Sequence, residues 1–472
     1  MPEQRTSYLR FVVLSFVSLV VVTTLGIASY YGRVLYIHFQ QLGQLRAEFD
    51  AINDRGEPLG GEKLEEFYSL PPDSVDNTAR ITQALQIFAG QETGPDAELI
   101  KELASLENLP PRPPQKWERL EEAETLVQKY ETALQALSVA LEAGGDARFP
   151  LDYARGLPAA MRFPHLQDQL NAQRLLVIQA LCLYQRGQLE QAAEKVCTLI
   201  RLADTVRLEP FSISLLVRQS TRSAALRTFA FLAGDQNFPA AGIQQIQAAV
   251  AAASFEDAYY RTSVGERAIF FEAIQLSLPE LDENKPRGGY AGGRAVAKRF
   301  PAYTSAALRH FTLHVEASKV PWPDSLTAAQ AARDEVKAAR DEVKAELDAS
   351  SNRPPQQRNV VAHLLYVPLH LNWELALRAE AERRAWLTVC AIKLYRKERG
   401  QLPENLAALV PLYLEQVPAD PLDQQPLRYR VQPSQYIVYS IGLNLQDDAG
   451  QVSRDSQGTS LDTGVAITRD MD

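Results

Sequence analysis

Residues 11–31, FVVLSFVSLVVVTTLGIASYY, form a run of 21 residues without a charged side chain. A helix rises 1.5 Å per residue, so a run of this length reaches about 30 Å, the thickness of the hydrocarbon core of a bilayer. The run therefore predicts a transmembrane helix. The rest of the chain then lies on one side of a membrane.

A cleaved signal peptide is the alternative interpretation of this run. Gly26 and Ala28 put small residues where a signal peptidase would cleave, and Arg5 and Arg10 form a positive leader. The apolar run is longer than the roughly 7–15 residues of an ordinary signal-peptide core. The apolar helical pattern also continues beyond the run, as far as Leu45. We therefore expect an uncleaved signal anchor.

Positive charges flank the predicted span on both sides. Arg5 and Arg10 precede it, and Arg33 and Arg46 follow it. Cytoplasmic flanks usually carry the excess of positive charge, so this near balance gives a small preference for a cytoplasmic N terminus. We expect residues 1–10 to form a cytoplasmic tail and the bulk of the chain to lie on the other side.

The composition predicts a folded protein of two or three domains. The chain has 472 residues, of which 46% are hydrophobic, and this is enough for a sizeable core. The formal net charge is −9, and no basic stripe marks a surface for nucleic acid. We therefore do not expect nucleic acid as a partner.

The chain contains three cysteines, Cys182, Cys197 and Cys390. They are too few and too scattered for a disulfide framework or a zinc site. All three lie on apolar faces of predicted helices, where cysteine usually packs as a small buried hydrophobe. A bridge between Cys182 and Cys197 is the alternative in an oxidising compartment, but we expect unpaired thiols in the core.

Glycine, proline and charge runs divide the rest of the chain into segments. We expect a juxtamembrane helix and linker over residues 32–61, followed by an α-helical domain over residues 62–355. That domain ends in the sequence SSNRPP, which is typical of a boundary. A long helix and a small helix-and-sheet module are expected over residues 356–472. The predicted fold class is therefore mainly α, with a small C-terminal α+β module.

Stacked helical pairs are predicted for the central domain. Amphipathic patterns with short connections indicate helices over residues 175–184, 189–207, 212–232 and 240–253. The pair around Gly187 resembles a tetratricopeptide-type hairpin, but the 34-residue period of that repeat does not recur. We therefore expect stacked pairs without a regular repeat.

Further helices are expected over residues 64–69, 77–89, 96–106, 257–278 and 295–317, and three more have distinctive patterns. A heptad stripe over residues 117–143 fits either a coiled coil or one helix of a bundle. The identical heptads AARDEVK over residues 331–344 predict a solvated helix supported by i,i+4 charge pairs. A last long helix is expected over residues 371–399.

The pattern of the sequence changes from helical to strand-forming towards the C terminus. Gly400 ends the long helix, whose last turn carries basic residues that suit the negative end of the helix dipole. Segments rich in tyrosine and β-branched residues then predict strands over residues 427–431 and 436–440, with a third over 465–467. These residues indicate a helix packed on a small antiparallel sheet.

These C-terminal residues resemble the major pseudopilin of bacterial type II secretion systems. The matching elements come in that family's order: Leu394-Tyr395, the turn GQLP at residues 400–403, the link VPADP at 417–421, the two strands, and then Gly442 and Asn444 before an acidic loop. The match covers roughly 85 residues. It implies a place in the bacterial inner membrane, with most of the chain in the periplasm.

In that family, the loop after the second strand binds calcium. The matching loop here offers Asp447 and Asp448, together with Asp455 and Asp462. Hard oxygen ligands at irregular spacing suit the flexible coordination of calcium. The resemblance therefore implies a calcium site in this loop, and a solvated acidic surface loop is the alternative.

No pattern in the sequence predicts catalysis. His310 and His314 lie one helical turn apart, but the glutamate that a metalloprotease helix places beside its first histidine is missing. We expect a partly buried or interface pair, and metal binding is the alternative. Ser212 and Ser214 are expected to cap a helix, and no Gly-x-Ser-x-Gly elbow occurs in the chain.

We do not expect an enzyme. The sequence favours a membrane-anchored scaffold with protein partners, linked to type II secretion or envelope assembly, because stacked helical pairs commonly present protein-binding surfaces. An envelope sensor that binds calcium or a small ligand is the alternative.

Overall fold

The computed structural model describes residues 29, 32–33, 36, 39–41, 43–44, 46–91, 93–105, 109–150, 163–275, 301–349, 370–452 and 461–468. The chain forms two compact units. The first contains residues 1–57, 273–309 and 339–366, and the second contains residues 58–272, 310–338 and 367–472.

The described residues of the first unit are almost all helical, among them residues 46–54. Three helices continue from one unit into the other: α11 (Ala258–Gln275), α13 (Pro301–Ser318) and α14 (Asp324–Ala349). The repeated AARDEVK heptads lie within α14, so the predicted helix is confirmed there.

The predicted transmembrane span, residues 11–31, lies outside the described residues except for Ser29. Among the residues that the structure does describe, no helix is both long enough and apolar enough to cross a membrane. The signal anchor therefore stays a prediction.

The second unit begins with five helices of 7 to 12 residues: α2 (Gly61–Phe67), α3 (Thr78–Gln86), α4 (Ala97–Leu103), α5 (Leu120–Lys129) and α6 (Glu131–Glu142). Longer helices follow: α7 (Pro164–Gln185), α8 (Leu189–Asp204), α9 (Ser212–Leu232), α10 (Ala240–Ala252) and α16 (His370–Arg399). The prediction of a mainly helical chain is confirmed.

The single helix predicted over residues 117–143 is wrong. The structure has α5 and α6 instead, separated at Tyr130. The hydroxyl of Tyr130 is 2.6 Å from Oε1 of Gln91 and 2.9 Å from Oδ2 of Asp96. These bonds hold Tyr130 in place at the break, so that α5 packs on α7 and α6 packs on α3.

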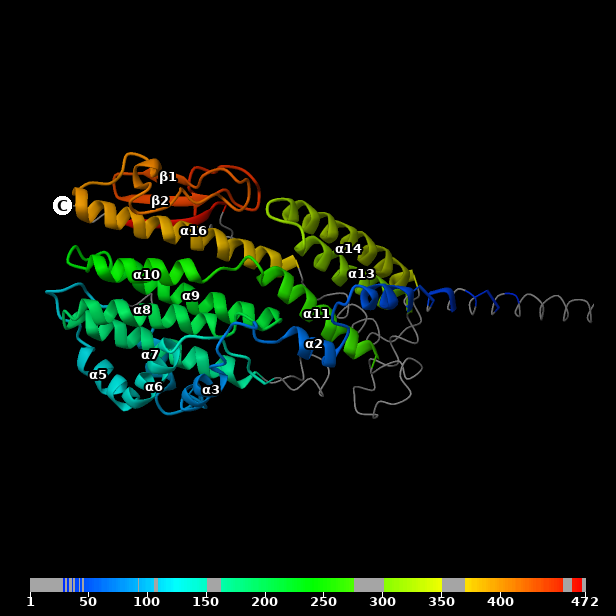
Figure 1. Cartoon of the computed structure of the whole chain (residues 1–472), viewed down its shortest axis with the longest axis horizontal. Coiled ribbons are helices and arrows are strands. Elements are labelled where there is room, and N and C mark those ends of the chain that lie inside the picture. The colour runs from blue at the N-terminus through cyan, green and yellow to red at the C-terminus, as the bar shows by residue number, and fades with distance from the viewer. Residues whose placement is uncertain are drawn as a thin grey trace, which may run out of the picture. The chain divides into compact units, whose positions relative to one another are not determined.

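Helices α7 to α10 form the stacked arrangement that the sequence predicts. Gly187 has a φ of 73° in the turn between α7 and α8, a conformation that glycine adopts without steric cost. Helix α8 packs on α7, α9 and α10, and α10 packs on α16. Figure 1 shows these helices as neighbouring layers.

The C-terminal module completes this second unit. Its three antiparallel strands are β1 (Arg428–Val431), β2 (Gln435–Ser440) and β3 (Thr463–Thr468), in the order β1-β2-β3. The three strands that the sequence predicts are therefore confirmed. Helix α16 packs on β2 and β3, and it lies between the sheet and α10 (Figure 1).

A buried carboxylate on α16 links the module to the stacked helices. Glu380 is fully buried and accepts hydrogen bonds from the guanidinium groups of Arg383 and Arg384, and from the backbone N–H of Phe255 at 3.2 Å. Nη1 of Arg384 also donates to the carbonyl oxygen of Ala419 at 2.9 Å. Burial acts to raise the pKa of Glu380, but the two arginines outweigh burial and the pKa is lowered.

Two buried arginines enclose the ring of Phe255. The guanidinium carbons of Arg218 and Arg222 lie 3.9 Å and 4.7 Å from the ring centroid. Arg218 also pairs with Asp204 at 2.7 Å. Burial lowers the pKa of Arg222 to about 10. This cation–π arrangement ties α9 to the connection between α10 and α11.

Candidate functional site

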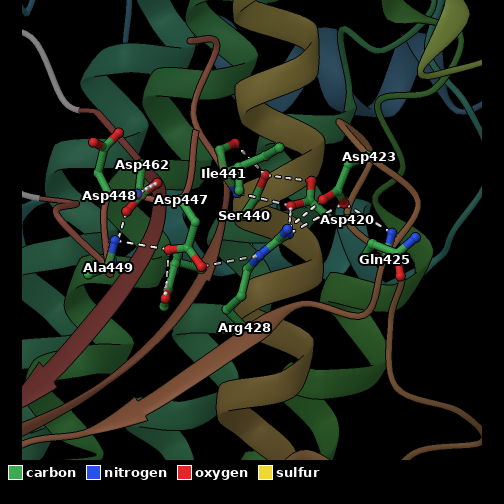
Figure 2. Close-up of polar contacts among 12 residues, drawn as sticks. Asp420, Asp423, Gln425, Arg428, Ser440, Ile441, Asp447, Asp448, Ala449 and Asp462 are labelled. Carbon is green, nitrogen blue, oxygen red and sulfur yellow. Dashed lines mark hydrogen bonds and ion pairs between the residues drawn. The ribbon is translucent and has the colours of Figure 1, made fainter. Parts of the chain in front are cut away.

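Five aspartates and one arginine gather at one end of the C-terminal sheet (Figure 2). The resemblance had singled out three of the aspartates, Asp447, Asp448 and Asp462. The other members are Asp420, Asp423 and Arg428, which sequence reasoning did not identify. We call this group the aspartate cluster.

Asp420 is the buried centre of the cluster. Its Oδ1 accepts from the backbone N–H of Leu422 at 2.9 Å and from the hydroxyl of Ser440 at 2.6 Å. Its Oδ2 accepts from the backbone N–H of Ile441 at 2.9 Å and from Nη1 of Arg428 at 2.5 Å. Burial raises the pKa of Asp420, and the bonds from Ser440, Leu422 and Ile441 act against that rise. The carboxylate thus joins the link before β1 to the end of β2.

Arg428 places a cation among three carboxylates. Besides Asp420, its guanidinium donates to Asp423, and its Nε lies 4.0 Å from Oδ2 of Asp447. Burial acts to raise the pKa of Asp423, but the hydrogen bond and the charge of Arg428, together with the backbone N–H of Gln425, outweigh burial and the pKa is lowered. The chain therefore supplies its own positive charge at the place where these carboxylates meet.

Asp462 fixes the acidic loop from inside. The side chain is fully buried and accepts from the backbone N–H groups of Asp448 at 3.3 Å, Gly450 at 2.7 Å and Gln451 at 3.0 Å. Three backbone donors on one carboxylate hold residues 448–451 in a turn. Asp462 therefore has a structural role in the described loop.

Asp447 and Asp448, the other two predicted ligands that the structure describes, also have hydrogen-bond partners. Oδ1 of Asp447 accepts from the hydroxyl of Tyr439 at 3.1 Å and from the backbone N–H of Ala449 at 2.9 Å. Oδ2 of Asp448 accepts from the amide of Asn444 at 2.7 Å. Burial and the carboxylate of Asp447 raise the pKa of Tyr439 to about 12.

These contacts bear on the predicted calcium site. Among the described residues, no three histidine, cysteine, aspartate or glutamate side chains are grouped so that they could hold a metal ion. Asp447, Asp448 and Asp462 each accept hydrogen bonds from other groups of the chain. Asp455 lies outside the described residues. The four-residue calcium site therefore stays a prediction.

Replacing Asp462 with alanine is expected to lower the free energy of unfolding by about 2–4 kcal/mol, because three backbone N–H groups lose their acceptor. Urea denaturation of the Asp462→Ala variant measures this loss. Asp448→Ala is the matched control, since the side chain of Asp448 bonds to one exposed amide, and we expect it to cost less than about 1 kcal/mol. Equal losses in the two variants would contradict the structural role of Asp462.

A buried serine, glutamate and histidine also lie together, but in an order that does not support catalysis. Glu209 occupies the centre, with Oε1 at 2.6 Å from Nε2 of His165 and Oε2 bonded to the hydroxyl of Ser214. In a catalytic triad the histidine lies between the nucleophile and the carboxylate.

The prediction that Ser212 and Ser214 cap the helix is wrong, because Phe211 occupies the N-cap position of α9 and no side chain caps it.

The two histidines on α13 are both buried, more completely than the partly buried pair that the sequence predicts. Nδ1 of His314 lies 2.8 Å from the hydroxyl of Tyr259, and the rings of His310 and His314 contact each other edge to face. Their exposed fractions are 6% for His310 and 0% for His314. Their contacts are those of core residues.

The three cysteines are free thiols in the core, as predicted. Burial raises the pKa of Cys182 and Cys390 to about 12 and that of Cys197 to about 11. Since the thiolate is the nucleophile, these groups are protonated and unreactive near neutral pH.

An open apolar groove of about 550 Å³ lies between α3 and α6. Its lining includes the alanines Ala84, Ala136 and Ala140. Ile87 and Val139 also line it, and their exposed fractions are 50% and 62%. We call it the α3/α6 groove. The groove brings large apolar side chains together at the surface. Contiguous exposed apolar patches mark binding sites more often than single exposed apolar residues do.

Comparisons of the chain with family models, with curated proteins and with solved structures find no match. The resemblance to pseudopilins therefore stays a prediction from the C-terminal residues.

Proposed function

We propose that the protein is a non-catalytic scaffold that binds a helix of another protein in the α3/α6 groove. The observation that carries this proposal is the groove itself, with two large aliphatic side chains exposed along an alanine-lined surface. Small residues at the base allow close approach of a partner backbone, and exposed aliphatic side chains provide contact area. An amphipathic helix laid into a groove uses both features.

The partner helix is expected to be acidic at one end of the groove. Arg80 lines the groove, and the remaining polar side chains among the described lining residues are the neutral Gln83, Thr132 and Gln135. The described lining therefore carries a positive charge without a negative one. A carboxylate on the partner would complement Arg80 and fix the direction of binding.

We further propose that the protein works at the bacterial inner membrane, with the helices and the C-terminal module in the periplasm. Residues 11–31 support the anchor, and the order of C-terminal elements supports a link to type II secretion or envelope assembly. The polar groups buried in the second unit fit a non-catalytic role. Glu209, Glu380 and Asp420 each bond to several donors of the fold itself.

The test is purification of the tagged full-length protein from native membranes after mild cross-linking, with mass spectrometry of the captured proteins. The Val139→Glu variant places a charge in the groove and is expected to reduce capture of the specific partner at least tenfold. Leu412→Glu is the matched control, because Leu412 is 74% exposed and does not line the groove, and it should leave capture unchanged.

Circular dichroism of both variants verifies that the helices are intact. If Val139→Glu captures the same partner as the unaltered protein, the groove is not the binding site. The absence of any specific partner in native membranes would overturn the scaffold function altogether. Enrichment of secretion-system components would support the proposed cellular role.

A further inference from the structure

The exposed face of α6 has the spacing of a coiled-coil seam. The residues on this face follow each other at intervals of four, three and four positions: Thr132, Ala136, Val139 and Ala143. All of them line the α3/α6 groove, and the side chain of Val139 is 62% exposed. Such intervals place side chains in one row along a helix, where they can meet the same row of a second helix. One wall of the groove is therefore also a surface that can pair with a helix of its own kind.

Two exposed charges lie at the same end of the groove. Nδ2 of Asn77, the residue just before α3, donates to the carbonyl oxygens of Ala140 at 2.6 Å and Gly144 at 2.9 Å. The start of α3 therefore lies beside the end of α6, which places Arg80 and Glu142 at the same level of the two helices. Both side chains are exposed, and neither forms an ion pair with another residue in the described part of the chain.

Within one copy, these two charges lie on different sides of α6. Ala140 borders the groove beside α3, and Glu142 lies about 200° further around the helix, since successive residues are about 100° apart. Glu142 is therefore on the side of α6 that faces away from α3. A rotation of a second copy by 180°, about an axis parallel to the helices, turns this side towards α3 of the first copy. Arg80 of each copy then faces Glu142 of the other.

We propose that two copies of the chain associate through their α6 helices, in parallel and with two-fold symmetry. Val139 of each copy lies in the α3/α6 groove of the other, and an Arg80–Glu142 pair closes the interface on either side. Both helices are short, so the interface is small and the copies separate readily. Because the partner helix binds in the same groove, self-association competes with it. This regulation of the groove rests on the proposed function.

Cysteine cross-linking of the full-length protein in its native membranes tests the pairing. Val139→Cys is expected to form a disulfide-linked dimer in mild oxidant, because each residue of the seam meets its own equivalent in a parallel two-fold pair. The three native cysteines are buried free thiols, so the unaltered protein should give no such dimer. Leu412→Cys is the matched control, since Leu412 is 74% exposed and lies outside the groove. Equal dimer yields from these two variants, or no dimer from Val139→Cys, would overturn the proposal.

A mixture of two tagged variants determines the direction of the helices. Thr132 and Ala143 lie about 16 Å apart along α6, at a rise of 1.5 Å per residue. Thr132→Cys should therefore link to Thr132→Cys of the second copy, and not to Ala143→Cys. A preference for the mixed dimer would show an antiparallel pair and contradict the proposed arrangement.

Charge reversal tests the contact between Arg80 and Glu142. Arg80→Glu and Glu142→Arg should each weaken self-association at least fivefold, because each brings like charges together across the interface. Sedimentation equilibrium of the protein in detergent measures this change. The variant with both reversals should regain the dissociation constant of the unaltered protein within about twofold.

Arg80→Glu combined with Glu131→Arg is the matched control for this rescue. Glu131 lies on the same side of α6 as Glu142 but at the other end of the helix, so it should not restore association. Equal rescue by Glu131→Arg and Glu142→Arg, or no rescue by Glu142→Arg, would contradict the contact.

Self-association and partner binding can fail independently. If two copies do not pair, the proposed regulation of the groove is wrong, while capture by Val139→Glu still decides the scaffold function. If Val139→Glu captures the same partner as the unaltered protein, the competition is excluded. The cross-linking of Val139→Cys then still decides whether two copies pair.

Discussion

Replacing Glu380 with alanine is expected to lower the free energy of unfolding by about 3–5 kcal/mol, because the guanidinium groups of Arg383 and Arg384 lose the buried carboxylate that they share. The backbone N–H of Phe255 loses its acceptor as well. Urea denaturation monitored by circular dichroism measures the change. Glu404→Ala is the control, because Glu404 is exposed, and it should change stability by less than about 0.5 kcal/mol.

The pH dependence of this effect has a definite sign. The pKa of Glu380 is lowered in the folded protein from its ordinary value of 4.5. The folded state therefore favours the ionised carboxylate, so its contribution is present above about pH 4.5 and is lost as the pH falls through the folded pKa. The stability difference between the unaltered protein and Glu380→Gln should narrow at acid pH. A difference that widens there would contradict the ion-pair account.

Replacing Asp420 with alanine should have an effect of similar size, about 3–5 kcal/mol, because Arg428, Ser440 and two backbone N–H groups lose their common acceptor. We also expect the module to loosen before the stacked helices do. Hydrogen exchange of the amides of β1 and β2 should therefore speed up more than that of α8.

Asp423→Ala provides a matched comparison for Asp420→Ala, since both carboxylates bond to Arg428 but the side chain of Asp423 is 26% exposed. A partly exposed ion pair contributes little, so we expect a loss of about 1 kcal/mol or less. If Asp423→Ala is as damaging as Asp420→Ala, burial does not decide the importance of these two residues.

Local patterns were enough to predict most of the elements. Helix α9 has the bounds that its apolar periodicity indicates, and all three strands lie where tyrosine or β-branched residues are concentrated. The break at Tyr130 could not be predicted in this way, because it depends on hydrogen bonds to Gln91 and Asp96, which are more than thirty residues distant in sequence. A heptad pattern continues across such a break without any local sign of it.

The aspartate cluster was predicted only in part, for a similar reason. Asp447, Asp448 and Asp462 stood out because they lie in a visibly acidic loop. Asp420 lies in a short proline-rich link that reads as a rigid connection, and only the fold brings Ser440 and Arg428 to its carboxylate. The burial of a charged side chain depends on partners from other elements, so a single stretch of sequence does not reveal it.

Helix α16 packs on α10 with one face and on β2 and β3 with another. Neither neighbour could keep its present surroundings if the chain were divided before residue 370. A fragment that ended there would expose the side of α10 that α16 covers. A fragment that began there would expose to water the face of α16 that packs on α10. The C-terminal module is therefore joined to the stacked helices through α16, which packs on both, and we expect neither part to keep its stability when the chain is cut before this helix.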